Sequence, residues 1–312
     1  MTNLKDTISD GPIKPTEVLR RRYWVSEIRQ MTGTFGEDSD RLEKLLAAEF
    51  ERDGLAAILD HVRTCGDIPE GYGHDSSEEK MYSKYTDILL SETFKALGLR
   101  SIVLKERGDS ADVECFADGF SFVADAKAFR LSRTAKNQKD FKVQAMDGWK
   151  RGKPFAMVVC PILQVPARTS QIYEQATTRN VCILSYSHLC LLLRLYSVDV
   201  KINVSEILRN VFDTVGALSP LKDAQAYWLA VSRSMLQSHP DARELWTEEK
   251  KKSIEILAAA KNEALTFLAE ERERIMRMSH ADALNELIRV HNLENRIRTI
   301  QAVTDNGLFS LT

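Results

Sequence analysis

One short stretch, residues 111–142, constrains the fold of this chain more than any other part. Residues 113–116 and 120–126 are runs rich in Val, Phe and Ala, which is typical of β-strands. The pair Asp118-Gly119 lies between them and favours a two-residue type I′ turn, in which both central residues need positive φ. The sequence therefore predicts a β-hairpin whose register is fixed by this turn.

The predicted register decides which side chains face one another. Because the side chains of a strand alternate between two faces, one face of the hairpin is apolar and the other collects Asp112, Glu114, Asp125 and Lys127. The expected cross-strand pairs are Ala117/Phe120, Phe116/Ser121, Cys115/Phe122, Glu114/Val123, Val113/Ala124 and Asp112/Asp125. The last pair sets two carboxylates opposite each other, with Cβ atoms roughly 5 Å apart.

Two facing carboxylates repel each other, and a hard divalent cation removes this repulsion. We therefore predict that Asp112 and Asp125 bind one or two Mg²⁺ ions and that Lys127 orients or deprotonates a water or stabilises charge on a phosphate. These are the groups needed to hydrolyse a phosphodiester. The same residues also fit an ordinary amphipathic hairpin with a solvated polar face.

A row of basic residues follows the hairpin at a spacing of three, namely Lys127, Arg130, Arg133, Lys136, Lys139 and Lys142. Such a strip next to a metal site suits the phosphate backbone of DNA. Asn137, Gln138 and Asp140 lie among these cations, and Asn, Gln, Lys and Asp side chains can pair with base edges. A solvated charged loop is the alternative interpretation.

The stretch ADAKAFRLSRTAKNQKDFK, residues 124–142, closely resembles the catalytic and recognition segment of HindIII-type restriction endonucleases, which belong to the PD-(D/E)xK nuclease superfamily. The likeness continues from about Ser77 to about Leu195, through SEEKMYSK, ERGDSADV, TSQIY, RNV and SHLCLLLRL. Residues 1–75 and the C-terminal third look much less similar. Ala111 stands where the superfamily motif has proline, which weakens the motif without touching the chemistry.

The resemblance implies a Mg²⁺-dependent type II site-specific deoxyribonuclease. It implies a homodimer that cuts duplex DNA at the palindrome 5′-AAGCTT, after the first A of each strand, and leaves four-base 5′ overhangs. The metal-binding acids map onto Asp112 and Asp125, the catalytic lysine onto Lys127, and the base-reading positions onto Asn137, Lys139 and Asp140. A methyltransferase of matching specificity that protects the host genome, and a bacterial cytoplasmic location, are also implied.

The whole chain fits this interpretation. It has 312 residues and a formal charge of −2, so that affinity for DNA has to come from local basic clusters. Five cysteines without a C-x-x-C spacing predict buried free thiols in a reducing compartment. Neither a signal-peptide pattern nor an apolar run of about 18 residues is present, so no membrane association is expected.

The expected fold is α/β, with a three-layer restriction-endonuclease-like core, a mixed central sheet and additional helical regions at both ends. We expect an N-terminal helical region at 1–75, a nuclease core at 76–200 with the DNA-recognition segment at 128–145, and a C-terminal helical region at 201–312. Helices are predicted at 16–31, 39–52 and 55–63, strands at 101–105, 155–160 and 181–185, and one long helix at 240–278 that is followed by a last helix to about 303.

Glu79 has two interpretations. Ser76 and Glu79 have the spacing of a capping box that begins a helix reaching about residue 97. Glu79 is alternatively the acid that a leading helix adds to the metal site in many related nucleases, and it is kept as a catalytic candidate. His188 precedes an apolar helix and is expected to be structural.

Other functions fit the same core. One alternative is a repair or recombination nuclease that recognises DNA structure, which would digest DNA to a smear where a restriction enzyme gives discrete fragments. Another is a DNA-binding module that does not cleave, which would bind without any Mg²⁺-dependent nicking.

Overall fold

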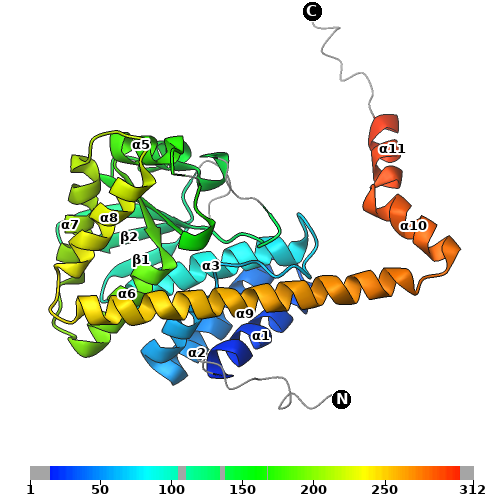
Figure 1. Ribbon diagram of the computed structural model, residues 1–312, viewed down its shortest axis with the longest axis horizontal. Coiled ribbons are helices and arrows are strands. Elements are labelled where there is room, and N and C mark those ends of the chain that lie inside the picture. The colour runs from blue at the N-terminus through cyan, green and yellow to red at the C-terminus, as the bar shows by residue number, and fades with distance from the viewer. Residues whose placement is uncertain (1–14, 105–109, 134–137, 167, 303–312) are drawn as a thin grey trace, which may run out of the picture. The chain divides into compact units, whose positions relative to one another are not determined.

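The computed structural model describes residues 15–104, 110–133, 138–166 and 168–302. Its centre is a five-stranded mixed sheet in the order β1-β2-β3-β4-β5 (Figure 1). The strands are β1 (Arg100–Val103), β2 (Val113–Ala117), β3 (Phe120–Ala126), β4 (Phe155–Cys160) and β5 (Val181–Ser185). The first three strands pair antiparallel and the last three pair parallel, which confirms the predicted mixed sheet.

The hairpin β2–β3 has the predicted register. Its pairs run from Ala117 opposite Phe120 to Val113 opposite Ala124, and Asp112 and Asp125 stand directly beyond the last of them. The predicted type I′ turn is wrong, because Gly119 is left-handed (φ +78°) while Asp118 is not. The backbone N–H of Asp118 instead donates a hydrogen bond to Ser205 Oγ (3.1 Å), a contact between distant parts of the chain that a local turn rule does not include.

Two groups of helices enclose the sheet (Figure 1). One group comprises α1 (Pro15–Arg29), α2 (Phe35–Thr64), α3 (Ser77–Ala96) and α6 (Tyr186–Val198). The other comprises α4 (Val143–Trp149), α5 (Gln171–Arg179), α7 (Val204–Ala217) and α8 (Ala224–Leu236). Short 3-10 turns lie at Gln138–Phe141 and Ile162–Gln164. Helices on both sides of a mixed sheet make the three-layer core that the sequence predicts.

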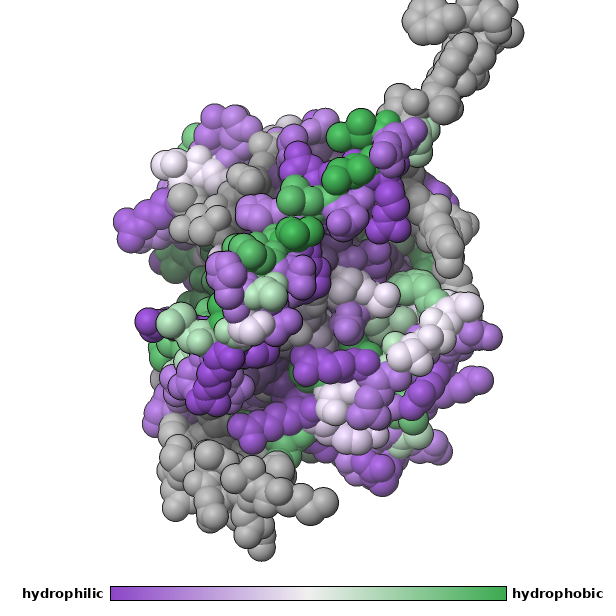
Figure 2. Space-filling view, turned by 90° about the vertical axis from the view of Figure 1, so that its right-hand side faces the viewer, coloured by the Kyte–Doolittle hydropathy of each residue, from purple (hydrophilic) through white to green (hydrophobic). Residues whose placement is uncertain are grey.

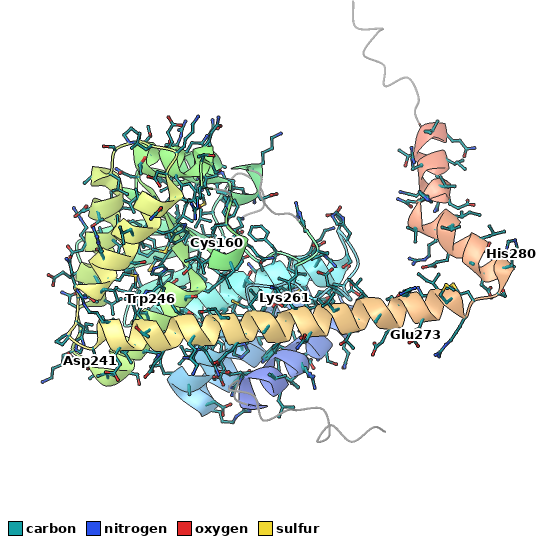
Figure 3. All side chains as sticks on the ribbon, in the orientation of Figure 1. Cys160, Asp241, Trp246, Lys261, Glu273 and His280 are labelled. Atoms are coloured by element: carbon teal, nitrogen blue, oxygen red, sulfur yellow. The ribbon has the colours of Figure 1, made fainter. Side chains whose placement is uncertain are left out.

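The two parallel strands β4 and β5 are buried on both faces. Every residue of β4 and β5 is buried, in agreement with their almost continuous apolar runs. Cys160, at the end of β4, lies among the core side chains (Figure 3). All five cysteines are buried free thiols, as predicted. His188 is buried as well, and its ring stacks on Trp246 with a centroid distance of 4.6 Å, which agrees with the expected structural role.

The N-terminal helices agree with the prediction except at one boundary. The two helices predicted at 39–52 and 55–63 lie on either side of a kink in α2 at Gly54, which has non-helical angles (φ 65°, ψ −153°). The N-cap Thr34 and Glu37 form a complete capping box, so the helix begins earlier than expected. Glycine adopts positive φ without a steric penalty and permits the kink at this position.

The C-terminal part divides at a point within the long helix α9 (Ala242–Met276): residues 1–262 form one compact unit and residues 263–312 a second. Ser279 caps α10 (His280–Val290) as predicted. The predicted single helix to about residue 303 is wrong, because Asn292 is left-handed (φ 53°) and separates α10 from α11 (Leu293–Gln301).

Helices α10 and α11 bury none of their residues. Their exposed apolar side chains include Leu284, Leu287, Ile288, Leu293, Ile297 and Ile300. Figure 2 shows apolar side chains gathered in a row on this part of the chain. Among the described residues, no helix is both long enough and apolar enough to cross a bilayer.

Candidate active site

Three carboxylates meet where the hairpin contacts helix α3. Asp112 directly precedes β2, Asp125 lies near the end of β3, and Asp87 lies in the middle of α3. One oxygen of each lies within 4.8 Å of the others. Strand pairing brings Asp112 and Asp125 together, and the packing of α3 on the first three strands adds Asp87. Such a set of oxygen donors matches the ligands that Mg²⁺ prefers.

Burial makes this cluster electrostatically strained. Asp125 is 1% exposed and Asp87 is 6% exposed. Burial, together with the charge of the Asp125 carboxylate, raises the pKa of Asp112 to about 6. Burial also raises the pKa of Asp87 well above its usual value, and the charges of Asp112 and Asp125 act in the same direction. The folded chain therefore disfavours three negative charges here unless a cation compensates them.

Lys127 is the one ammonium bonded to this cluster in the described residues. Its Nζ lies 2.6 Å from both oxygens of Asp125. Burial lowers the pKa of Lys127, but the Asp125 carboxylate more than offsets this effect, so that the pKa lies above its ordinary value. Its backbone N–H donates to Val159 O (2.7 Å) and its carbonyl accepts from Tyr186 Oη (3.0 Å), which fixes the lysine at the end of β3.

Glu114 was expected on the same face of the hairpin, but it is not part of the cluster. Its carboxylate pairs with Lys153 at 2.9 Å. The polar face is also not solvated as the amphipathic-hairpin alternative assumed, because Val123 and Asp125 are buried, like every residue of β3 from Phe122 to Ala126. The covering layer of helices, which strand alternation does not reveal, accounts for this difference.

The acid contributed by the leading helix is Asp87 and not Glu79. Glu79 accepts hydrogen bonds from the Asp75 backbone N–H (2.6 Å) and from Arg130 Nε (3.3 Å). It stays at the first turn of α3, where Ser76 is the N-cap. Asp87 lies two helical turns further on. The sequence signal for Asp87 was an acidic residue within the most apolar part of this helix, next to Ile88. Such a position is rarely occupied by an unpaired acid, and in the structure Thr86, Asp87 and Ile88 are all buried.

The basic segment, residues 128–145, begins directly after Lys127. Its described surface cations are Arg133, Lys139 and Lys142. Arg133 pairs with Asp140 (3.1 Å), and Lys142 Nζ lies 5.3 Å from the centroid of the Trp149 ring. Lys136 and Asn137 lie outside the described residues, as does the side chain of Gln138.

Arg130 differs from the exposed members of the predicted basic row, Arg133, Lys139 and Lys142. Its residue is 7% exposed, and its guanidinium is surrounded by backbone carbonyl groups and Glu79. In this structure it does not lie on the surface, where a phosphate contact was predicted. The spacing of three suggested one exposed strip, but the chain folds Arg130 inward because it meets the loop before α3.

Residues 22–304 match the family model described as HindIII restriction endonuclease. The chain is 31% identical over 248 residues to the type II restriction enzyme HindIII of Haemophilus influenzae, covering 78% of this chain and 83% of the relative. The similarity therefore extends well beyond residues 77–195, into both regions that had looked much less similar. The chain belongs to the HindIII restriction endonuclease family of type II restriction enzymes.

Proposed function

We propose that this protein is a Mg²⁺-dependent type II restriction endonuclease that cleaves the palindrome 5′-A^AGCTT-3′ in duplex DNA and leaves 5′-phosphate overhangs. It acts as a homodimer in the bacterial cytoplasm, beside a methyltransferase that protects the same site in the host. The observation that carries the proposal is the buried cluster of Asp87, Asp112 and Asp125 with Lys127 bonded to it. Family membership supports the same reaction.

Asp112 and Asp125, joined by Asp87, are the residues that would hold the metal. When bound there, Mg²⁺ supplies a Lewis acid and lowers the pKa of a coordinated water. The three carboxylates fit this ion because they offer several hard oxygen donors in a small buried space.

Lys127 is assigned to the attacking water and the scissile phosphate. Its raised pKa keeps the side chain charged at neutral pH, which favours orientation of water and stabilisation of phosphate charge. In-line attack of water on phosphorus breaks the bond to the 3′-oxygen. The products are a 5′-phosphate and a 3′-hydroxyl.

The basic segment is assigned to DNA. Arg133, Lys139 and Lys142 are exposed and suit phosphate groups. Asn137, Lys139 and Asp140, with Gln138, are assigned to the base edges, and Lys136 to the backbone, by their match to the family's recognition segment. A palindromic site has two-fold symmetry, which a symmetric dimer matches.

Digestion of a plasmid of known sequence with Mg²⁺, followed by mapping of the ends, tests the whole proposal. Discrete fragments that end at AAGCTT with four-base 5′ overhangs are expected, and a chelator should prevent them. Discrete fragments that end at another sequence would refute the proposed recognition site but not the restriction activity. A smear would refute sequence specificity.

Substitutions of single site residues test their assigned roles. Asp125→Asn and Lys127→Ala should each reduce cleavage by about a hundredfold or more while DNA binding persists. Glu114→Gln is the matched control, because Glu114 lies on the same hairpin but pairs with Lys153. Cleavage by either active-site variant at the wild-type rate would show that the roles are wrongly assigned.

A further inference from the structure

Arg130 connects the basic segment to the loop of residues 66–73, which precedes α3. The guanidinium is almost fully enclosed, with 7% of the residue exposed. It donates to the carbonyl oxygens of Tyr72 (2.7 Å), Gly73 (2.9 Å), Glu70 (3.3 Å) and Pro69 (3.4 Å) and to Glu79 Oε1 (3.3 Å). One side chain thus binds four carbonyl groups in the second half of this loop, between residues 69 and 73.

The backbones of the same two segments are also paired. Phe129 N–H donates to Gly66 O (3.0 Å), and Ile68 N–H donates to Phe129 O (3.1 Å), around a parallel bridge between Asp67 and Phe129. Gly66 also lies close to Pro161, because a Cβ at this position would lie 3.0 Å from Pro161 Cβ. The loop is therefore seated tightly against the residues that follow Lys127.

Further contacts hold the basic segment on both sides of residues 134–137. Ser132 donates from its backbone N (2.9 Å) and its Oγ (2.7 Å) to the Glu70 carboxylate. The rings of Phe129 and Phe141 pack with centroids 5.4 Å apart, and both rings are buried. The ion pair between Arg133 and Asp140 joins the same two ends.

We infer that the loop of residues 66–73, here called the clasp, is a positioning element for sequence recognition, and that Arg130 is its principal positioning residue. This inference rests on the proposed function. Base contacts need side chains held to within about half an ångström, whereas phosphate contacts position the protein without reading sequence. Loss of contacts between the clasp and the basic segment should therefore reduce discrimination between DNA sites more than it reduces the rate of cleavage at the cognate site.

The catalytic lysine has its own support, which makes the two effects separable. Lys127 is bonded through its backbone to Val159 and Tyr186, and through Nζ to Asp125. None of these bonds involves the clasp. Variants of Arg130 should for this reason leave kcat at the cognate site within about threefold of wild type.

The test compares kcat/KM on a duplex carrying the mapped cleavage site with kcat/KM on duplexes that differ by one base pair. Arg130→Gln should lower the ratio of these two values by roughly tenfold, the discrimination that one base contact supplies. Arg130→Lys keeps the charge but loses the planar fork of donors, so it should restore the ratio only in part.

Arg63→Lys is the matched control. Arg63 is also a buried arginine held by carboxylates, those of Glu17 and Glu249, and it does not contact the basic segment in the described structure. It should lower Tm as Arg130→Lys does and leave the ratio unchanged. A ratio that is equally unchanged in the folded Arg130 variants would overturn the inference and leave Arg130 with a structural role alone.

Two milder variants keep the inference testable if the Arg130 variants do not fold. Ser132→Ala and Glu70→Gln each remove part of the bond between clasp and segment, and each should lower the ratio severalfold. If both variants keep the wild-type ratio of kcat/KM values, the inferred positioning role of the clasp is wrong. A wild-type protein that cleaves no DNA would instead overturn the proposed function, and the clasp with it.

Discussion

Asp87 is a buried carboxylate whose charged form is disfavoured by the two other acids beside it. It has the burial of a core residue, and its pKa is raised well above the usual value by that burial and by its two acidic neighbours. Without a metal, the folded chain thus favours the neutral form of this side chain more than water does for a solvated carboxyl group. A site that is strained without its cation is a common arrangement where function, and not stability, selects the residue.

Asp87→Asn should separate stability from activity. Asparagine imitates the neutral acid, so the variant without metal should be more stable at pH 8 by about 1 kcal/mol or more, which corresponds to about 2–4 °C in Tm. Cleavage should fall by about a hundredfold or more, since even the outer partners of a metal site contribute 10–100-fold. Thermal unfolding with a chelator and plasmid cleavage with Mg²⁺ measure the two effects.

Glu92→Gln serves as the control on the same helix. Glu92 pairs with Lys95 away from the acidic cluster. Its substitution should change Tm by less than about 2 °C and leave cleavage intact. A Tm for Asp87→Asn below that of wild type would show that this carboxylate stabilises the metal-free fold, contrary to the argument.

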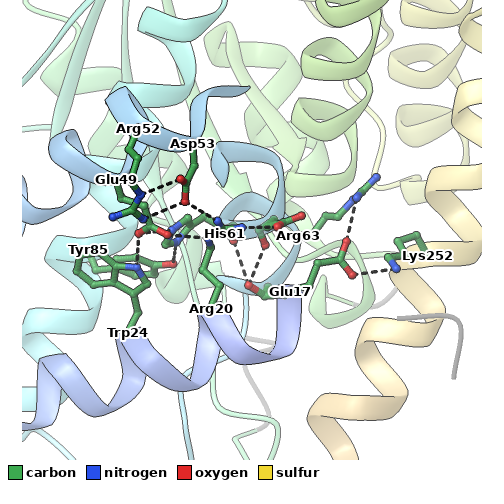
Figure 4. Close-up of polar contacts among 12 residues, drawn as sticks. Glu17, Arg20, Trp24, Glu49, Arg52, Asp53, His61, Arg63, Tyr85 and Lys252 are labelled. Atoms are coloured by element: carbon green, nitrogen blue, oxygen red, sulfur yellow. Dashed lines mark hydrogen bonds and ion pairs between the residues drawn. The ribbon is translucent and has the colours of Figure 1, made fainter. Parts of the chain in front are cut away.

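At the scale of elements, a polar cluster joins α1, α2 and α3 (Figure 4). Glu49 accepts from Arg20 Nε (2.6 Å), Trp24 Nε1 (2.6 Å) and His61 Nε2 (3.2 Å). His61 Nδ1 lies 2.6 Å from Tyr85 Oη on α3, two residues from Asp87. Burial raises the pKa of Glu49, but His61, Arg20 and Trp24 outweigh it and lower the pKa to about 2.

This lowered pKa predicts a loss of stability in acid. The folded-state pKa lies below that of the unfolded chain, so the Glu49 contribution is fully present above about pH 4.5 and is lost as the pH falls toward 2. With allowance for partial exposure, it amounts to about 2 kcal/mol. Glu49→Gln should therefore be less stable than wild type at pH 6, and the difference should shrink toward pH 2.5.

Urea unfolding at a series of pH values measures this contribution. Glu37→Gln is a suitable comparison, because Glu37 caps the same helix at an exposed position. Its effect should be smaller at every pH. A Glu49→Gln difference that is constant between pH 6 and 2.5 would show that the carboxylate charge contributes nothing.

At the scale of the whole molecule, buried ion pairs join helices that are distant in sequence. Glu249 of α9 is 1% exposed and receives hydrogen bonds from Arg63 Nε (3.0 Å) and Nη2 (2.7 Å) of α2. Glu17 of α1 pairs with Arg63 (3.0 Å) and with Lys252 (2.8 Å). The first half of α9 is anchored to the N-terminal helices by these charges, beside the packing of Trp246 (Figure 3).

Glu249→Gln should destabilise the protein by about 3–5 kcal/mol, because it leaves the buried Arg63 without its main carboxylate partner. Urea unfolding measures the change. Glu248→Gln is the matched control: Glu248 is adjacent and pairs with Arg194, but its side chain is 56% exposed, so its loss should be within about 1 kcal/mol. Equal effects of the two variants would refute a special role for the buried pair.

Much of the fold follows from local patterns. The continuous apolar runs at 155–160 and 181–185 coincide with β4 and β5, because a buried parallel strand needs no polar face. The hairpin register follows from a two-residue connection. The turn type, the early start of α2 at Phe35 and the break at Asn292 were mispredicted, since backbone angles and caps at single positions depend on neighbours that the pattern does not contain.

The sequence by itself determined the hairpin, the meeting of Asp112 and Asp125, the position of Lys127 beside them and the family. Alternation and turn length are local properties, and they fix these relations within about fifteen residues of chain. The tertiary structure alone decided that Asp87 completes the acidic cluster, that Glu79 remains a cap and that Arg130 turns inward to the clasp. These depend on how α3 and the loop before it pack on the sheet, and packing joins residues that no local periodicity relates.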